Sequence, residues 1–372
     1  MPKRVLVVFG TRPEAIKLAR VVARMQEHPA LEPVVAVTAQ HREMLDQVLE
    51  LFGIEPDFDL DIMLPEQTLT GVTLRALDGL SPLIESERPD AVLVQGDTTS
   101  TFVAALAAFY HRIPVGHVEA GLRTNDMYRP FPEEVNRRLT TQVARWHFAP
   151  TATAAAHLYA ENIDPARVHV TGNTVVDALM HVREMPYEFP PGRTADAMSD
   201  GSRIVLVTAH RRESWGEPMA HIFTAVRDIA LRFDDVHLMI ATHRNPVVAD
   251  EAERILASVE RADLLGPVEY LPFVKLMEAS TLILSDSGGI QEEAPTLGKP
   301  VLVLRDVTER PEALEAGVVK LVGTDRDRIF GEAERLLTDD AAYEAMARTA
   351  NPFGDGHAAE RICDILGRDL EA

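Results

Sequence analysis

The chain has 372 residues, of which 46% are apolar and 26% charged, an ordinary globular composition whose length favours two domains. Its net charge of −21 gives a mean field that repels nucleic acid and acidic membrane surfaces, so neither is an expected partner. Cys363 is the single cysteine, which excludes an intramolecular disulfide, and we expect a cytoplasmic protein because neither a secretory segment nor an apolar run of about 20 residues is present.

Short runs rich in Val, Leu and Ile recur along the first half, and each is followed by a segment with helical character. The predicted strands are 4–9, 34–38, 91–94, 115–118, 147–149 and 168–170. Strands of the buried type that alternate with helices predict a parallel sheet covered on both faces. We therefore assign residues 1–185 to an N-terminal Rossmann-like domain.

The turn after the first predicted strand contains Arg12 and Pro13, and Lys17 follows one helical turn later. Proline suits the first turn of a helix, and a helix start with two cations could hold an anion. An ordinary strand-to-helix turn with solvated side chains explains these residues equally well. The G-x-G-x-x-G pattern of dinucleotide sites is missing here, and the chain has no Tyr-x-x-x-Lys pair, so no NAD or other cofactor is expected.

Four residues are placed for proton transfer: Asp97, Glu119, Glu133 and His210. All but Glu133 directly follow predicted strands, and ligands of doubly wound sheets bind beyond the carboxyl ends of the strands. For any one carboxylate, the alternative is a helix N-cap or a surface ion pair.

A second series of strands follows a Pro-rich and polar stretch from 184 to 202, where we place a linker. Its predicted strands are 204–208, 237–241, 268–270, 282–285, 301–304 and 320–322. We assign residues 200–350 to a C-terminal Rossmann-like domain. A last helix, from about 356 to 370, is predicted to return residues 351–372 to the N-terminal domain.

The turn after the predicted strand 282–285 is rich in small residues. It reads Asp286-Ser287-Gly288-Gly289 and ends near Glu293, so it offers free backbone N–H groups to a diphosphate. Glu293 would lie roughly 9 Å further on, within reach of ribose hydroxyls. The alternative is a glycine-rich cap with surface acids.

Two further turns offer candidate ligand-binding residues, and two other patterns are rejected as sites. Arg310 and His243 each follow a predicted strand; the first suits phosphate oxygens, and a surface turn or a capping role is the alternative for each. Residues 57–61 resemble a calcium loop, but Ile62 stands at the glycine position, so no metal site is predicted. Cys363 has no neighbour that would stabilise a thiolate, so we expect it in the core.

Four strings carry a family resemblance over essentially the whole chain. They are Gly10 to Lys17, Gly116 to Arg123, His210 to Glu213 and Asp286 to Pro295. With these strings the chain resembles the bacterial non-hydrolysing UDP-N-acetylglucosamine 2-epimerases, which have the two-domain architecture of the B-type glycosyltransferases. The resemblance implies two Rossmann-like domains facing a cleft, a homodimer, and UDP-N-acetylglucosamine as substrate and as activator.

The resemblance also implies roles for individual residues. Asp97, Glu119, Glu133 and His210 fall on catalytic positions. The positions that hold UDP correspond to Arg12, Lys17, His243, Phe273, Ser287, Gly288, Gly289, Glu293 and Arg310. An activator site corresponds to Gln40, His41, Arg75 and Arg211. The chain departs from the family in having Gln95 where His usually precedes Gly-Asp, Ala19-Arg20 in place of Ala-Pro, and Arg129 where Ser is common.

The implied reaction is reversible epimerisation at C2 of UDP-N-acetylglucosamine to give UDP-N-acetylmannosamine. Elimination of UDP to a glycal and re-addition would need acid and base groups near C2 and no redox cofactor. Three alternatives stay open: a hydrolysing epimerase that releases N-acetylmannosamine and UDP, a glycosyltransferase of the same fold, and a UDP-sugar-binding regulator without turnover.

Overall fold

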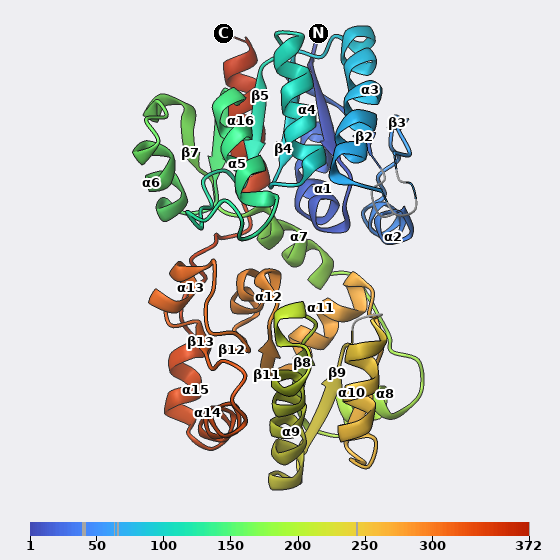
Figure 1. The fold of residues 1–372 in the computed structure, drawn as a ribbon, viewed down its shortest axis with the longest axis vertical. Coiled ribbons are helices and arrows are strands. Elements are labelled where there is room, and N and C mark those ends of the chain that lie inside the picture. Colours follow the sequence, from blue (N-terminus) through green and yellow to red (C-terminus); the bar gives the residue numbers. More distant parts are fainter. Residues whose placement is uncertain (39–41, 63, 65–66, 243–244, 372) are drawn as a thin grey trace. The chain divides into compact units, whose positions relative to one another are not determined.

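The computed structural model describes residues 1–38, 42–62, 64, 67–242 and 245–371. The chain forms two compact units (Figure 1). Unit 1 contains Met1–Met180 together with Phe353–Ala372, and unit 2 contains His181–Pro352. Each is an α/β fold with its own parallel sheet.

Unit 1 has a seven-stranded sheet in the order β3-β2-β1-β4-β5-β6-β7. All its pairs are parallel. Its strands are β1 (Lys3–Phe9), β2 (Leu31–Val37), β3 (Phe58–Asp59), β4 (Ala91–Gln95), β5 (Val115–Val118), β6 (Trp146–Ala149) and β7 (Val168–Val170). The short edge strand β3 had not been predicted, because two residues give no periodicity to detect.

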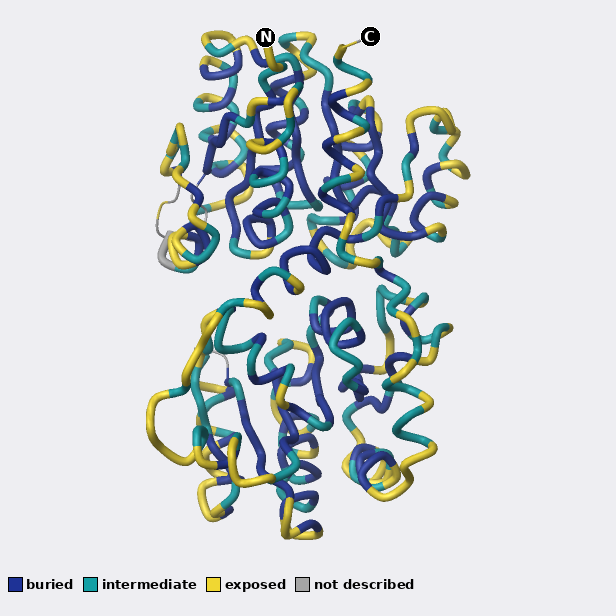
Figure 2. The backbone as a smooth tube through the Cα atoms, turned by 180° about the vertical axis from the view of Figure 1, so that it is seen from behind, coloured by how far each residue is buried: buried dark blue, intermediate teal, exposed yellow. Residues whose placement is uncertain are grey.

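Helices cover both faces of this sheet. The helices of unit 1 are α1 (Arg12–Glu27), α2 (Arg42–Phe52), α3 (Leu69–Glu87), α4 (Thr99–Tyr110), α5 (Glu133–Val143), α6 (Ala152–Ala160) and α16 (Ala358–Glu371), with a 3-10 turn η1 (Pro165–Arg167); α7 (Thr174–Arg183) begins in unit 1 and ends in unit 2. Apolar residues of α3 and α4 pack on Val92 and Val94. Gly116 faces Leu93 and Leu366 of α16, so α16 covers the opposite face, beside α1. The strands between these layers are buried (Figure 2).

Unit 2 has a six-stranded parallel sheet in the order β10-β9-β8-β11-β12-β13. Its strands are β8 (Arg203–Thr208), β9 (Val236–Ile240), β10 (Ala262–Leu264), β11 (Ser280–Ser285), β12 (Val301–Val303) and β13 (Val319–Leu321). Apolar residues of three helices, α9 (Glu217–Arg232), α10 (Pro246–Leu256) and α14 (Arg326–Thr338), form one core cluster with strand residues such as Val205 and Leu284. The remaining elements are α8 (Arg193–Ser199), η2 (Arg212–Ser214), α11 (Tyr270–Ala279), α12 (Gly288–Glu293), η3 (Ala294–Leu297), α13 (Pro311–Glu315) and α15 (Asp340–Ala347).

The predicted strand at 268–270 is wrong. The strand β10 lies at Ala262–Leu264, beside β9, and Tyr270 begins α11 with Glu269 as its N-cap. A valine and a tyrosine in three residues carry too little periodicity to separate a strand from a helix start. The stretch assigned to a linker also contains α8, whose Arg193 and Thr194 contact Asp263 of unit 2.

Candidate active site

Glu119 stands directly after β5 and is buried. Its backbone has φ +66°, a left-handed conformation that is uncommon for a residue with a side chain. The Oε1 atom lies 2.5 Å from Nζ of Lys17 and accepts a 3.4 Å hydrogen bond from Nδ2 of Asn173. The Oε2 atom accepts from Nε2 of Gln95. Donors from three separate segments therefore fix this carboxylate at the end of β5.

Asp97 stands after β4, which pairs directly with β5. Its Oδ2 lies 2.6 Å from the guanidinium of Arg137, and its backbone carbonyl accepts from Nδ2 of Asn136 at 3.0 Å. The preceding Gly96 has φ +75°, and its carbonyl accepts a 2.7 Å hydrogen bond from Nε2 of His117. The turn that carries Asp97 is thus held from β5 and from α5.

Glu133 is the first residue of α5 and is half-buried. Its neighbour Glu134 is fully buried and accepts hydrogen bonds from the backbone N–H groups of Thr124 and Asn125 and from Arg138. Burial raises the pKa of Glu134, but these donors outweigh it and hold the pKa below its usual range. The buried carboxylate therefore anchors the loop that connects β5 to α5.

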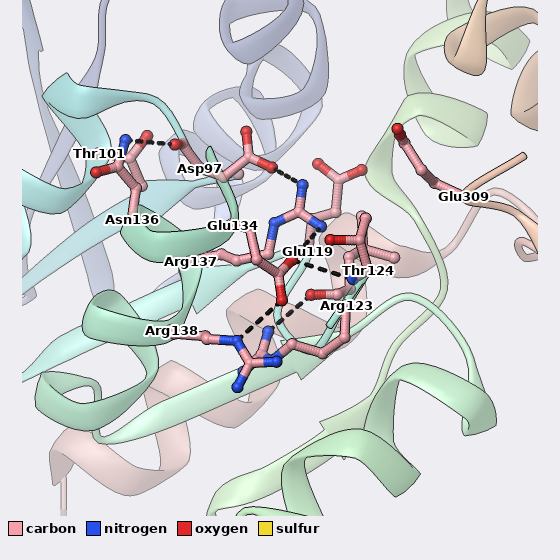
Figure 3. A network of polar contacts seen from close by, with 12 residues as sticks. Asp97, Thr101, Glu119, Arg123, Thr124, Glu134, Asn136, Arg137, Arg138 and Glu309 are labelled. Carbon is pink, nitrogen blue, oxygen red and sulfur yellow. Dashed lines mark hydrogen bonds and ion pairs between the residues drawn. The ribbon is translucent and has the colours of Figure 1, made fainter. Parts of the chain in front are cut away.

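A chain of ion pairs continues from this anchor (Figure 3). Arg137 lies between Asp97 and Glu134, at 2.6 and 3.4 Å, and its side chain is 7% exposed. Arg123 makes two hydrogen bonds to Glu161, at 2.7 and 2.8 Å. Because β4 pairs with β5, Asp97 and Glu119 lie at the same edge of the sheet in unit 1, and the network holds Asp97 there.

The start of α1 is fixed by a buried carboxylate as well. Oε2 of Glu14 accepts from the backbone N–H groups of Gly10 and Thr11, at 2.7 and 2.8 Å, and Oε1 accepts from the hydroxyl of Thr98 at 2.5 Å. This capping box with Thr11 ties the turn after β1 to the turn after β4. Arg12 begins the helix and is half-buried.

In unit 2, His210 follows β8 and lies beside Asp286, which follows the paired strand β11. The Nδ1 atom of His210 is 3.1 Å from Oδ1 of Asp286. The other carboxylate oxygen accepts from the backbone N–H groups of His210 and Arg211, at 2.7 and 2.8 Å. Asp286 is completely buried.

The glycine-rich turn begins α12, with Ser287 as its N-cap. A Cβ on Gly288 would lie 3.1 Å from the guanidinium carbon of Arg310, so this glycine gives Arg310 room beside the turn. Arg310 pairs with the buried Glu292 at 2.9 Å. At the end of α12, Glu293 accepts a 2.6 Å hydrogen bond from the hydroxyl of Tyr270.

The remaining predicted residues lie on several elements of the two units. Gly289 lies in the first turn of α12, and Phe273 is half-buried in α11. Arg75 of α3 donates to the carbonyl of Ile62 and to Gln67, within unit 1, whereas Arg211 belongs to unit 2. Gln40, His41 and His243 lie outside the described residues.

Several neighbours of these side chains had not been predicted as site residues: Gln95, Asn173, Arg137, Glu134, Asp286 and Glu292. Asp286 and Glu292 are part of one of the four strings that carry the resemblance, and Gln95 directly follows the predicted strand 91–94, so position alone could have marked them. Asn173 and Arg137 carry no such signal, because their contacts cross 54 and 40 residues of chain.

Two surface pockets lie away from these residues. One, of about 600 Å³, is lined in unit 1 by Arg145, Trp146, Arg167 and Asp369, among others. Trp146 is at the start of β6, the opposite end of the sheet from Asp97 and Glu119. The other pocket is lined by residues around Arg193 and Asp263 in unit 2.

Metal ligands and membrane-spanning helices are both missing from the described part of the chain. No cluster of three or more His, Cys, Asp or Glu side chains is arranged there to hold a metal ion. No helix among the described residues combines the length and apolarity needed to cross a bilayer. Cys363 is buried, and burial raises the pKa of its thiol to about 12, as expected for a core residue.

Comparison with known proteins gives a consistent family. The family model described as UDP-N-acetylglucosamine 2-epimerase matches residues 23–367. The UDP-N-acetylglucosamine 2-epimerase of Escherichia coli K12 is 54% identical over 368 residues, which covers 98% of each chain. A protein of Thermotoga maritima, described as a putative UDP-N-acetylglucosamine 2-epimerase, is 56% identical over 365 residues, 98% of this chain and 96% of the relative.

Solved structures agree with the sequence relatives. The crystal structure of UDP-GlcNAc 2-epimerase from Neisseria meningitidis bound to UDP-GlcNAc matches with a TM-score of 0.90 and 49% identity, covering 98% of this chain and 100% of that one. The glycotransferase of kitacinnamycin matches over both full chains with a TM-score of 0.68 at 13% identity. The latter likeness shows the fold alone, and it supports the B-type glycosyltransferase architecture predicted from the sequence.

Proposed function

Because the chain belongs to the UDP-N-acetylglucosamine 2-epimerase family, we propose that it interconverts UDP-N-acetylglucosamine and UDP-N-acetylmannosamine without hydrolysing either. A base removes the proton at C2 while the bond from C1 to the diphosphate oxygen breaks, and the electron pair leaves with UDP. Re-addition of the same oxygen to C1 and of a proton to the opposite face of C2 gives the epimer. The balance needs no oxidant, reductant or water.

The observation that carries this proposal is the pairing of carboxylates at the ends of β4 and β5. Asp97 and Glu119 follow neighbouring strands, and each is held by a cation, Arg137 and Lys17 respectively. Two positioned carboxylates suit the two proton transfers that inversion at C2 requires. We assign the acid and base roles to two residues of the set Asp97, Glu119 and Glu133.

Unit 2 is proposed to bind UDP. The support is the turn from Ser287 to Gly289 with the guanidinium of Arg310 against Gly288, a combination of backbone N–H groups and a cation that suits phosphate oxygens. The UDP-binding residues proposed in unit 2 are His243, Phe273, Ser287, Gly288, Gly289, Glu293 and Arg310. Arg12 and Lys17 of unit 1 are also proposed to contact UDP. His210 is proposed to contact the diphosphate.

Regulation and assembly are further parts of the proposal. We propose that UDP-N-acetylglucosamine also activates the enzyme through Gln40, His41, Arg75 and Arg211, and that the protein is a cytoplasmic homodimer. Support for a dimer comes from α3 and α4, which contact each other and expose Leu69, Leu74, Phe109 and Tyr110.

The test is incubation with UDP-N-acetylglucosamine in D2O, followed by proton NMR. Deuterium at C2 together with UDP-N-acetylmannosamine is the expected result. Free N-acetylmannosamine would replace the proposal by the hydrolysing reaction, and a sugar unchanged at C2 would reject epimerisation. At least one of Asp97→Asn and Glu119→Gln should abolish the exchange, because any two of the three carboxylates include one of them, whereas Asp90→Asn, at the opposite end of β4 and paired with the surface residue Lys3, should not.

A further inference from the structure

Asp286 contacts both the backbone and the side chain of His210, each through a different carboxylate oxygen. Asp286 is fully buried, and the surroundings of its two oxygens differ, because only Oδ2 accepts hydrogen bonds from the backbone. Oδ2 accepts the backbone N–H groups of His210 and Arg211, at 2.7 and 2.8 Å, and Oδ1 lies 3.1 Å from Nδ1 of the His210 ring. One oxygen holds the backbone after β8, and the other faces the imidazole.

The charge state of Asp286 follows from these partners. Burial raises the pKa of Asp286, but the His210 ring and the two backbone N–H groups outweigh it, so that the pKa is lowered overall. An ionised carboxylate can only accept hydrogen bonds. The proton of the neutral imidazole is therefore drawn to Nδ1, and Nε2 becomes the acceptor nitrogen.

We propose that Asp286 is a positioning residue that fixes the ring orientation and the tautomer of His210. With Nδ1 committed to Asp286, Nε2 is the nitrogen that acts on the substrate: in the neutral ring it can accept a proton, and once protonated it can donate to a diphosphate oxygen. This inference rests on the proposed function only in giving His210 a substrate to act on. The orientation of a catalytic or binding histidine by a buried carboxylate is a general device.

A comparison inside the chain separates this role from simple loop support. Asp177 of α7 is also buried, but both of its oxygens accept backbone N–H groups, those of Ala358 and Ala359, at 3.2 and 2.8 Å. In Asp286, a single oxygen accepts both backbone N–H groups. The second oxygen is not needed to hold the loop, and it is the one that faces the His210 ring.

The experiment uses Asp286→Asn in the full chain, with Asp177→Asn as the matched control. The amide oxygen of the introduced asparagine can still accept from His210 and Arg211, but its NH₂ group then faces Nδ1, which must give up its proton. We expect the ¹⁵N spectrum of labelled histidines, recorded where the ring is neutral, to show Nδ1–H in the parent and Nε2–H in Asp286→Asn. The His210→Gln spectrum identifies the signal.

The kinetic expectation is a loss of kcat of about 100-fold or more, the size of a misplaced acid–base group. Asp177→Asn should change neither the His210 tautomer nor kcat. An Nε2–H tautomer in the parent, or an unchanged kcat in a variant whose tautomer has switched, would overturn the inference. The tautomer measurement needs no turnover, so absence of epimerase activity in the parent rejects the proposed function without rejecting the contact.

Discussion

The ammonium group of Lys17 lies 2.5 Å from Oε1 of Glu119, across 102 residues of chain. The two side chains are 12% and 6% exposed. Because both charges are shielded from water, each depends on the other for its stabilisation. The pair therefore links the first turn of α1 to the catalytic carboxylate proposed at the end of β5.

Lys17→Met is expected to destabilise unit 1 strongly. Removing one partner of a buried pair costs about 3 to 5 kcal/mol, and the hydrogen bonds from Gln95 and Asn173 offset part of it. Unit 1 contains Trp146 and unit 2 contains Trp215, so Trp146 fluorescence in a Trp215→Phe background follows urea unfolding of unit 1.

The matched control is Lys3→Met. Lys3 pairs with Asp90 at the surface, where both side chains are more than a third exposed, and exposed pairs contribute less than about 1 kcal/mol. Equal losses in the two variants would contradict the structural role of Lys17. A weaker affinity for UDP in Lys17→Met, measured by titration calorimetry, would support the UDP contact that the family resemblance implies.

Gln95→Leu is expected to lower kcat by about 10-fold to 100-fold. The substitution removes a buried donor to Glu119, and a hydrogen bond to a charged group contributes about 1.5 to 3 kcal/mol. Gln95→His restores the residue usual in the family, whose ring can also donate, so it should retain activity. Steady-state rates of both variants decide the matter, and full activity in Gln95→Leu would show that this donor is dispensable.

Because His117 is buried, we expect the free energy of unfolding to fall at acidic pH. Burial lowers the pKa of His117 from 6.5 to about 4, so the folded state stays neutral where the unfolded chain binds a proton. Stability is complete above pH 6.5 and falls as the pH drops towards 4, by about 2 kcal/mol at pH 5. His147, beside it on β6, has its pKa lowered to about 3, by burial and then by His117, and adds to the same trend.

The variant that tests this is His117→Gln, which can still donate to the carbonyl of Gly96 but does not titrate. Urea midpoints for unit 1 between pH 7 and pH 5 should fall less steeply in His117→Gln than in the parent. His221→Gln, on the surface of α9, should leave the slope unchanged. Parallel pH profiles for the parent and His117→Gln would refute the assignment.

We expect alanine substitution to have opposite effects on stability at Gly121 and Gly331. Gly121 has φ +95°, and a Cβ there would lie 2.2 Å from the backbone oxygen of Ala154, so Gly121→Ala should lower the melting temperature sharply or prevent folding. Gly331 lies within α14 with open space around it, so Gly331→Ala should stabilise by about 0.5 to 1 kcal/mol. Thermal unfolding of both variants measures the contrast, and a stable Gly121→Ala would contradict the packing described here.

The strands could be predicted because buried parallel strands are nearly continuous apolar runs. That rule located β1, β4, β5, β8 and β11, and with them the turns that carry Asp97, Glu119, His210 and Asp286. It failed at 268–270, where three residues resemble a strand and begin a helix. The sequence alone therefore predicts which residues follow the end of a strand.

The sequence alone does not predict which side chains far apart in the chain contact each other. Arg137 and Asp97 are 40 residues apart, and nothing in either local pattern shows that they meet. Lys17 was expected only at an anion site on α1, since its spacing from Glu119 becomes meaningful once β1, β4 and β5 are adjacent. Such contacts depend on strand order, which a single sequence does not encode locally.

The position of α16 in the chain sets the order in which the two units can be completed during synthesis. Its Asp369 accepts a hydrogen bond from the indole of Trp146, and Asp177 accepts from the first N–H groups of the helix, so unit 1 is complete only when residues 353–371 have been made. Unit 2 is continuous, and all of it leaves the ribosome before α16 does. We therefore expect unit 2 to be complete before unit 1 during synthesis, while the face of the unit 1 sheet that α16 shares with α1 is only partly covered.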